Sequence, residues 1–390
     1  MMTLARISLR FSIWMMLIIA ALSLSTPRAV AHELRPTIVD VVLGEGGAVA
    51  LSLSANAEAM LAGIGPEHDD TDDAPEAVRY DALRAAEPEA LAADLRAFAP
   101  RLIDGIALEM GGEAVPLTLD GIDVPPVGDT SRARNTTIRL TGIRPTGEDA
   151  PGEALDWRFA PEFGASVLRL IRAGEGEPFD SAYAVPGDTV TLATGAGAVP
   201  RGAMQTLIEY IPIGFDHIVP KGLDHILFVI GLFLLSTRLG PLLWQVTTFT
   251  LAHSVTLALA ALGLVTVSPA IVEPLIAASI VFIAVENMLT DRLHKWRLLT
   301  VFVFGLLHGL GFAGVLAEFG LPADQFVAGL IGFNIGVEVG QLAVIAACFL
   351  LVGFWFADKP WYRRFIVFPV SAVIALIAAY WFVQRIGLLG

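Results

Sequence analysis

The spacing of apolar positions changes near the middle of the chain. Before residue 205, apolar and polar residues alternate in short runs, as in Val39–Leu43 and Ala48–Leu53, which flank the turn-like Gly44–Gly47. From Leu223 onward the apolar runs lengthen to about 20 residues, the length of a helix that crosses a bilayer. The pattern therefore predicts a β-rich part followed by membrane-spanning helices.

Short strand-like segments recur through the first part. Besides the hairpin, strands are expected at 106–110, 136–140, 155–159, 166–171 and 189–192. Between them, Pro75–Ala99 is rich in Ala, Glu, Leu and Arg and is typical of one or two helices. Several short strands separated by turn signals predict a small β-sandwich that carries a helical insertion.

The second part predicts an all-α bundle. Helices are expected at 222–237, 241–264, 270–290, 298–317, 325–355 and 364–385. The segment Met204–Phe215 is amphipathic and is expected to lie along the outer membrane face. The predicted fold class is thus mixed, with an N-terminal β-rich, sandwich-like soluble domain followed by a transmembrane bundle of about six helices.

The N-terminus has the three parts of a secretory signal. Arg6 and Arg10 precede the short apolar run Phe11–Leu24, and Ala29–Ala31 offers a small-x-small cleavage site. We expect residues 1–31 to be a signal peptide, 32–205 an acidic periplasmic domain and 206–390 the transmembrane domain. Cleavage would make His32 the N-terminus, whose amine and imidazole can together chelate Cu²⁺ or Ni²⁺.

Charge separates the two parts and limits their partners. Residues 32–205 hold 29 acidic and 13 basic side chains, a balance that repels nucleic acid and concentrates cations. The single cysteine, Cys348, excludes an intramolecular disulfide and a thiolate cluster. Any metal site must therefore use His, carboxylate, amide or backbone ligands.

Basic residues fall in alternate loops of the predicted bundle. They are Arg238 after the first helix, Arg292, Lys295 and Arg297 after the third, and Lys359, Arg363 and Arg364 after the fifth. The opposite loops hold no base. By the positive-inside rule, we expect a bacterial inner-membrane protein with a periplasmic N-terminal domain and a periplasmic C-terminus.

Polar side chains interrupt these apolar helices, although charges and imidazoles are costly in hydrocarbon and usually mark a function. They include His217, Asp224, His225, Thr250, His253, Glu286, Asn287, His308, Asn334, Glu338 and Gln341. Each one alone fits an interhelical hydrogen bond, but together they predict a shared intramembrane site or path. Imidazole and carboxylate without thiolate suit Ni²⁺, Co²⁺ or Zn²⁺ in preference to Cu⁺.

The predicted fifth helix has two contrasting faces. Gly332, Gly336 and Gly340 form a small-residue ridge that lets another helix approach closely. Asn334, Glu338 and Gln341 lie on a different face. We expect this helix to pack on one side and to line a wet or charged space on the other.

Five segments together resemble the HupE/UreJ family of bacterial membrane proteins, some of which are nickel permeases linked to hydrogenase and urease operons. The segments are His217–His225, Thr248–Ser254, Val285–Asn287, Leu307–Ala313 and Gly332–Glu338. The start His32-Glu-Leu-Arg-Pro36 is similar to the branch with a long periplasmic domain. Two departures from nickel permeases are the six residues between His217 and Asp224, where those proteins have five, and Val315 at the position of a Glu.

The resemblance implies a permease that moves a divalent transition metal, nickel first, from periplasm to cytoplasm. Asp224 and His225 would capture the ion, while His253, His308 and Glu338 would form the central site. The path would be lined by His217, Thr250, Glu286, Asn287, Asn334 and Gln341, with Glu286 at the cytoplasmic exit. The expected partners are the lipid bilayer and the metal ion, which is cargo and not a permanent cofactor. No Gly-x4-Gly-Lys-Ser/Thr loop is present, so ATP is not expected as a partner.

Two other function classes remain open. The chain can be a non-transporting accessory for metalloenzyme maturation that docks a periplasmic protein through its sandwich. It can also be an intramembrane enzyme in which His and Glu hold Zn²⁺ and activate water. In the accessory case, substitution of His253 or His308 would lower abundance more than metal uptake.

Overall fold

The computed structural model describes residues 36–386 apart from 67, 69–70, 72–73, 129, 131–132, 145–153, 177, 195–201, 295 and 319–322. The predicted signal peptide and His32 lie outside these residues. The chain divides into two compact units, one β-rich and one helical. Each unit has its own interior and is described by itself.

Two sheets form the β-rich unit. The larger has the strand order β5-β6-β2-β1-β8-β9 and the smaller the order β10-β7-β3-β4. The strands are β1 (Thr37–Leu43), β2 (Ala48–Ala55), β3 (Ile106–Met110), β4 (Glu113–Ala114), β5 (Leu117–Asp123), β6 (Thr136–Ile143), β7 (Ala154–Phe159), β8 (Ser166–Arg172), β9 (Pro178–Ala184) and β10 (Thr189–Ala193). The expected hairpin is confirmed, since β1 and β2 pair antiparallel, while β1 and β8 pair in parallel.

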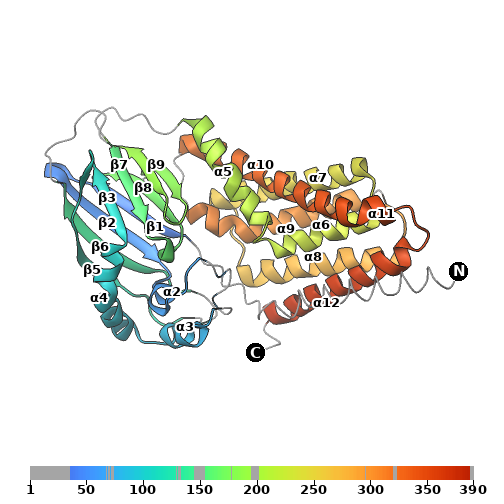
Figure 1. Cartoon of the computed structure of the whole chain (residues 1–390), viewed down its shortest axis with the longest axis horizontal. Helices are drawn as coiled ribbons and strands as arrows, with labels where there is room; N and C mark the ends of the chain where they lie inside the picture. Colours follow the sequence, from blue (N-terminus) through green and yellow to red (C-terminus); the bar gives the residue numbers. More distant parts are fainter. Residues whose placement is uncertain are drawn as a thin grey trace. The chain divides into compact units, whose positions relative to one another are not determined.

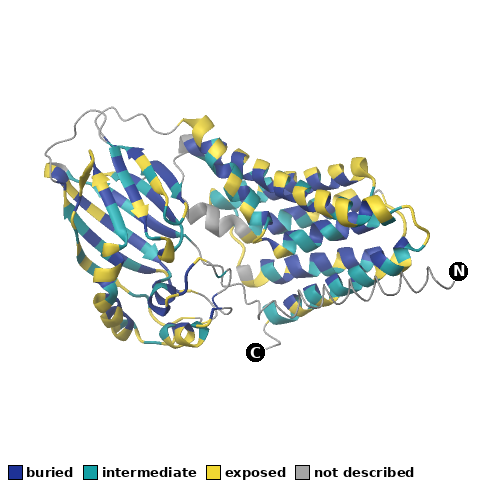
Figure 2. Cartoon of the chain, in the orientation of Figure 1, coloured by how far each residue is buried: buried dark blue, intermediate teal, exposed yellow. Residues whose placement is uncertain are grey.

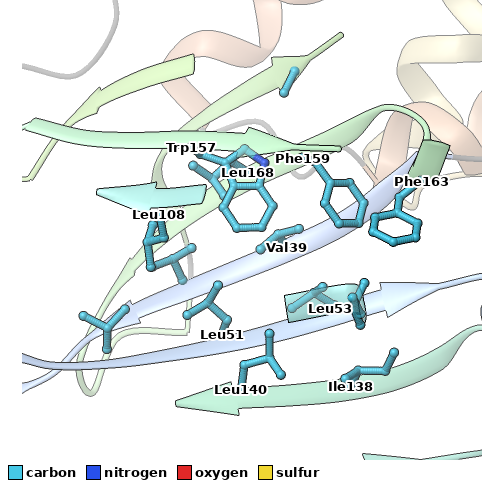
Figure 3. Close-up of a cluster of buried hydrophobic side chains, with 14 of the residues drawn as sticks. Val39, Leu51, Leu53, Leu108, Ile138, Leu140, Trp157, Phe159, Phe163 and Leu168 are labelled. Carbon is cyan, nitrogen blue, oxygen red and sulfur yellow. The ribbon is translucent and has the colours of Figure 1, made fainter. Parts of the chain in front are cut away.

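The two sheets share one hydrophobic core, which makes this unit a sandwich. Every second residue of β2 is buried, so Leu51 and Leu53 point inward with Leu140 of β6. Trp157 and Phe159 of β7 meet them from the smaller sheet (Figure 3). The buried Trp157 indole also donates a 2.9 Å hydrogen bond to the Ser166 hydroxyl, so its polar atom is satisfied.

The helical insertion expected at Pro75–Ala99 is present as two helices, α3 (Ala77–Arg84) and α4 (Pro88–Asp104), and a further helix that was not expected, α2 (Ala57–Ala62), precedes them. It is anchored by a buried ion pair, because Arg134 Nε lies 2.7 Å from Glu58 Oε1 and both side chains are less than a tenth exposed. The remaining donors of Arg134 cap this insertion by bonding the carbonyls of Leu83 and Ala86.

The helical unit contains α5 (Ala203–Ile218), α6 (Leu223–Leu235), α7 (Leu239–Ala261), α8 (Pro269–Leu289), α9 (Arg297–Glu318), α10 (Ala323–Cys348) and α12 (Phe368–Arg385). Two π-helical segments, Phe349–Gly353 and Arg363–Val367, and the short α11 (Phe354–Phe356) join the last two long helices. Among the described residues, four helices are long and apolar enough to cross a membrane, or five if α5 and α6 count as one bent span. The apolar bundle expected from the sequence is therefore confirmed (Figure 1).

The outward faces of these helices are apolar. Exposed residues recur along α10 at Val327, Ile331, Ile335 and Val339, one per helical turn (Figure 2). A helix with an apolar outer stripe and polar groups turned inward reverses the usual order in water. This arrangement is the one that a lipid environment requires.

The segment Met204–Phe215 does not lie along the membrane face as expected. As α5, it lies lengthwise on the glycine ridge of α10, with the Leu207 carbonyl against Gly332 and the Ile211 carbonyl against Gly336. The two helices run in the same direction, since Ile218 then reaches Gly340. A Cβ at Gly332 or Gly336 would collide with the α5 backbone, and one at Gly340 would press on the Ile218 side chain, so the predicted close approach is made by α5.

Candidate metal centre

Three histidines meet in the interior of the helical unit. His217, His225 and His253 each offer a ring nitrogen, and these atoms all lie within 4.8 Å of one another. Nitrogen ligands of a tetrahedral ion lie about 3.3 Å apart when the metal–nitrogen bonds are about 2.0 Å. Small side-chain rotations therefore suffice to bring the three nitrogens onto one metal ion.

A break between two helices brings the first two histidines together. α5 ends at Ile218, α6 begins at Leu223, and their axes differ by 74°. Pro220 cannot continue the backbone hydrogen bonding of a helix, and Gly222 packs against the backbone of His217. As a result, His217 and His225 face each other across the bend with ring centroids 4.9 Å apart.

Asp224 orients the His225 ring. Its Oδ1 atom accepts the His225 backbone N–H at 2.8 Å and lies 2.9 Å from His225 Nδ1. An ionised carboxylate only accepts hydrogen bonds, so Nδ1 carries the proton and Nε2 keeps its lone pair. This is the arrangement in which a carboxylate fixes the tautomer of a metal-binding histidine.

His308 of α9 lies against this group, and a hydrogen bond at Nδ1 fixes the tautomer of its ring as well. Its Nδ1 donates to the Phe304 carbonyl at 2.8 Å, which leaves Nε2 with the lone pair. Its ring centroid is 4.9 Å from that of His225. The Nε2 atoms of His225 and His308 are both buried and have no hydrogen-bond partner among the described residues.

His253 is the most enclosed member of the group. It is fully buried, and neither ring nitrogen has a hydrogen-bond partner in the part of the chain that the structure describes. Asn334 of α10 lies close enough to interact with its ring. Buried polar atoms without partners cost about 1–3 kcal/mol each, and a metal ion would satisfy several of them at once.

The polar stripes of α7 and α10 face each other and form a seam that leads away from His253. Thr250 donates to Gln341 Oε1 at 2.9 Å, and nearer the start of α7, Thr247 donates to Glu338 Oε1 at 2.7 Å. The Thr250–Gln341 pair is buried, whereas Thr247 is exposed. Where the sequence predicted a wet or charged space, Glu338 and Gln341 thus make direct hydrogen bonds to α7.

Glu286 and Asn287 belong to a separate buried cluster. Arg297 is 1% exposed and makes an ion pair with Glu286, although the sequence analysis placed it in a basic loop. It also donates to Gln245 at 2.9 Å and to Asn287 at 3.3 Å, and Asn287 donates to the Gly231 carbonyl. The cluster ties α6, α7, α8 and α9 together where α9 begins.

Comparison with protein families matches residues 194–385 to the model described as HupE / UreJ protein. The helical part of the chain belongs to the HupE/UreJ family. Comparison with curated proteins and with solved structures found no match. Of the five HupE/UreJ-like segments, four supply side chains to the histidine group or the seam, and Val285–Asn287 supplies the Arg297 cluster.

The HupE/UreJ bundle differs from the expected arrangement at more residues than Glu286 and Asn287. His225, expected to capture the ion with Asp224, lies in the group with His253, and that group of three does not include His308. His217 was expected on the path, but it lies in the group with His225 and His253. The spacing to Asp224 is not informative here, because the helix breaks between the two residues. Glu338 was expected in the central site, but it pairs with Thr247 in the seam. The group of three among the described residues does not include it.

Proposed function

We propose that this protein is a permease for a divalent transition metal ion, with nickel as the first candidate and cobalt and zinc as the alternatives. The observation that carries the proposal is the convergence of three imidazoles in the interior of an apolar bundle, with one nitrogen atom of each within 4.8 Å of the other two. Neutral imidazoles are good ligands for these ions. A set without thiolate holds them less firmly than a structural thiolate site, which suits an ion that must leave again.

The broken span supports a role in transport. Transporters that alternate access often bind their cargo where a spanning helix is interrupted, because the interruption exposes ligands within the membrane. Here the break between Ile218 and Leu223 carries one histidine on each side. Asp224 lies at the start of α6 and would attract the cation while it orients His225.

The α7–α10 seam is the proposed path away from the centre. It offers oxygen atoms from both helices, namely those of Asn334 and of the Thr247–Glu338 and Thr250–Gln341 pairs, which bridge α7 and α10. These groups are hard or intermediate ligands that bind a transition metal more weakly than imidazole. An ion that leaves His253 along the seam would pass toward the side of the basic loops.

Glu286 and Asn287 have a structural role in this proposal. The Arg297 guanidinium neutralises Glu286, so its carboxylate is a poor ligand for a second cation. We assign this cluster to holding four helices in register, in place of the cytoplasmic exit suggested by the sequence. The predicted orientation, with the basic loops cytoplasmic and the β-rich unit periplasmic, is part of the proposal.

Uptake of radioactive nickel and cobalt tests the proposal in cells that lack their own nickel transporters. His225→Ala, His253→Ala and Glu338→Gln should abolish or strongly lower uptake at unchanged membrane abundance. His294→Ala, which alters an exposed histidine outside the centre, should leave uptake normal. Normal abundance without uptake of either ion by the wild type would reject nickel and cobalt as the cargo and favour the accessory role.

A further inference from the structure

Three phenylalanines lie directly beside the histidines on the same helices. Phe228 follows His225 by three residues on α6, Phe249 precedes His253 by four on α7, and Phe304 precedes His308 by four on α9. Each is therefore one helical turn from its histidine on the same side of the helix. In every case that turn lies toward the loops that hold Arg238 and Arg292.

The three rings form a continuous layer. The Phe228 centroid lies 5.0 Å from that of Phe249 and 6.2 Å from that of Phe304, both within the range of favourable aromatic contacts. Phe228 and Phe249 are 0% and 1% exposed. The layer also contacts the histidines. The ring centroid of Phe249 lies 5.0 Å from that of His308 and 5.8 Å from that of His225.

We propose that Phe228, Phe249 and Phe304 are the barrier that closes the metal centre on the side of the basic loops. The inference rests on the proposed function, since it names the residues that keep the cargo from passing straight through the bundle. An aromatic constriction excludes water and is therefore closed to a hydrated ion. The seam beside it, with the Thr250–Gln341 pair, then offers the ion a polar way past the layer.

The layer has a feature that ordinary core packing does not require. The phenylalanines come from the three helices that carry His225, His253 and His308, and each stands three or four residues from its histidine toward the same end of the bundle. Rotation or displacement of one helix would therefore move an imidazole and a barrier ring together. Binding of the metal would be coupled to the opening of the layer.

Thiol labelling tests the barrier without using metal. Cys348→Ala removes the only cysteine, and His225→Cys places a reporter on the centre side of the layer. A membrane-impermeant thiol reagent is applied from the basic-loop side, using inverted vesicles. We expect slow labelling in this background and labelling roughly tenfold faster when Phe249→Ala opens the constriction.

The matched control is Phe282→Ala. The ring centroids of Phe282 and Phe304 lie 5.6 Å apart, but Phe282 is 42% exposed. Loss of the Phe282 ring should therefore not open a way to the metal centre. Equal labelling with and without Phe249→Ala would overturn the barrier. If Phe249→Ala fails to accumulate, Phe228→Ala is measured against the same control and decides in the same way.

The labelling result is independent of the uptake result. Faster labelling in the layer variants of a protein that takes up no metal would retain the barrier and reject the permease. Saturable uptake by the wild type with unchanged labelling in the variants would retain the permease and reject the barrier.

Discussion

The histidines of the centre are defined as much by their partners as by their mutual distances. Asp224 and the Phe304 carbonyl fix the tautomers of His225 and His308 so that both Nε2 lone pairs stay available. A purely structural histidine in an apolar bundle would use its second nitrogen in a hydrogen bond to another helix. The buried nitrogens of His253 and the two Nε2 atoms lack such partners among the described residues.

Because the His253 nitrogens lack hydrogen-bond partners among the described residues, replacing His253 should affect stability in opposite ways with and without metal. His253→Leu removes two unpartnered polar atoms from the interior, so the metal-free protein should keep or gain stability, by about 1–3 kcal/mol at most. The extra stability that added Ni²⁺ gives the wild type should disappear, because a ligand stabilises only the state that binds it. Thermal unfolding in detergent measures both, with His294→Leu as the control that keeps the nickel effect. A large loss of stability without metal would mean that His253 is structural.

The Arg297 cluster should respond to substitution in the way of a buried ion pair. Arg297→Met leaves the Glu286 charge buried without its partner and should destabilise the protein by about 3–5 kcal/mol. Adding Glu286→Leu should restore most of that loss. The measurement is membrane abundance together with thermal stability, and Arg292→Met, which alters a side chain that is 86% exposed, is the control. If the double variant is stable but uptake is lost, then Glu286 serves the path after all.

At the scale of elements, the glycine ridge of α10 decides where His217 lies. α5 can approach α10 closely enough only because Gly332 and Gly336 present no side chain to its backbone and Gly340 none to Ile218. A displaced α5 would withdraw His217 from the other two histidines, which stand on α6 and α7.

Gly336→Leu should therefore weaken metal binding without removing any ligand. A Cβ at this position would meet the Ile211 carbonyl, so α5 must move outward. We expect the purified variant to bind nickel at least about tenfold more weakly, the range seen when residues that support metal ligands are lost. Ile335→Leu alters a neighbouring side chain that is 40% exposed and should bind normally. Unchanged affinity in Gly336→Leu would show that His217 is dispensable.

Most elements could be predicted from the sequence because they follow regular periods. The hairpin strands alternate, and the long apolar helices match the thickness of a bilayer. Strand β9 was missed because Pro178, Asp180 and Ser181 break the apolar alternation. The strand forms because it pairs antiparallel with β8, whose backbone hydrogen bonds hold it in the sheet. Such pairing is a property of the tertiary structure and leaves no local signal.

The histidines of the centre could be predicted as a set, but their grouping could not. A count of residues along a helix assumes that the helix continues, whereas the chain bends by 74° between Ile218 and Leu223. That bend brings His217 into the group and makes its spacing from Asp224 irrelevant. Arg297 was assigned to a loop because basic residues near the ends of membrane-spanning helices usually lie in the cytoplasmic loops. Its pairing with Glu286 depends on the packing of two helices.

At the scale of the whole molecule, the orientation of the bundle follows from charge. With Cys348→Ala as background, a cysteine at Arg292 should react with an impermeant thiol reagent only from the cytoplasmic side, since the basic loops are expected there. A cysteine at Val267, which is 39% exposed in the opposite loop, should react only from the periplasmic side. Labelling of intact cells and of inverted vesicles compares the two positions. The reverse pattern would invert the proposed direction of transport.

The most direct measurement of the central claim is X-ray absorption spectroscopy of the purified protein loaded with one equivalent of nickel or cobalt. We predict one ion per chain with imidazole scattering from three histidines at metal–nitrogen distances of about 2.0–2.1 Å. His253→Ala should lose one imidazole, and His294→Ala should leave the spectrum unchanged. A spectrum without imidazole, or one that His253→Ala does not alter, would contradict the metal centre.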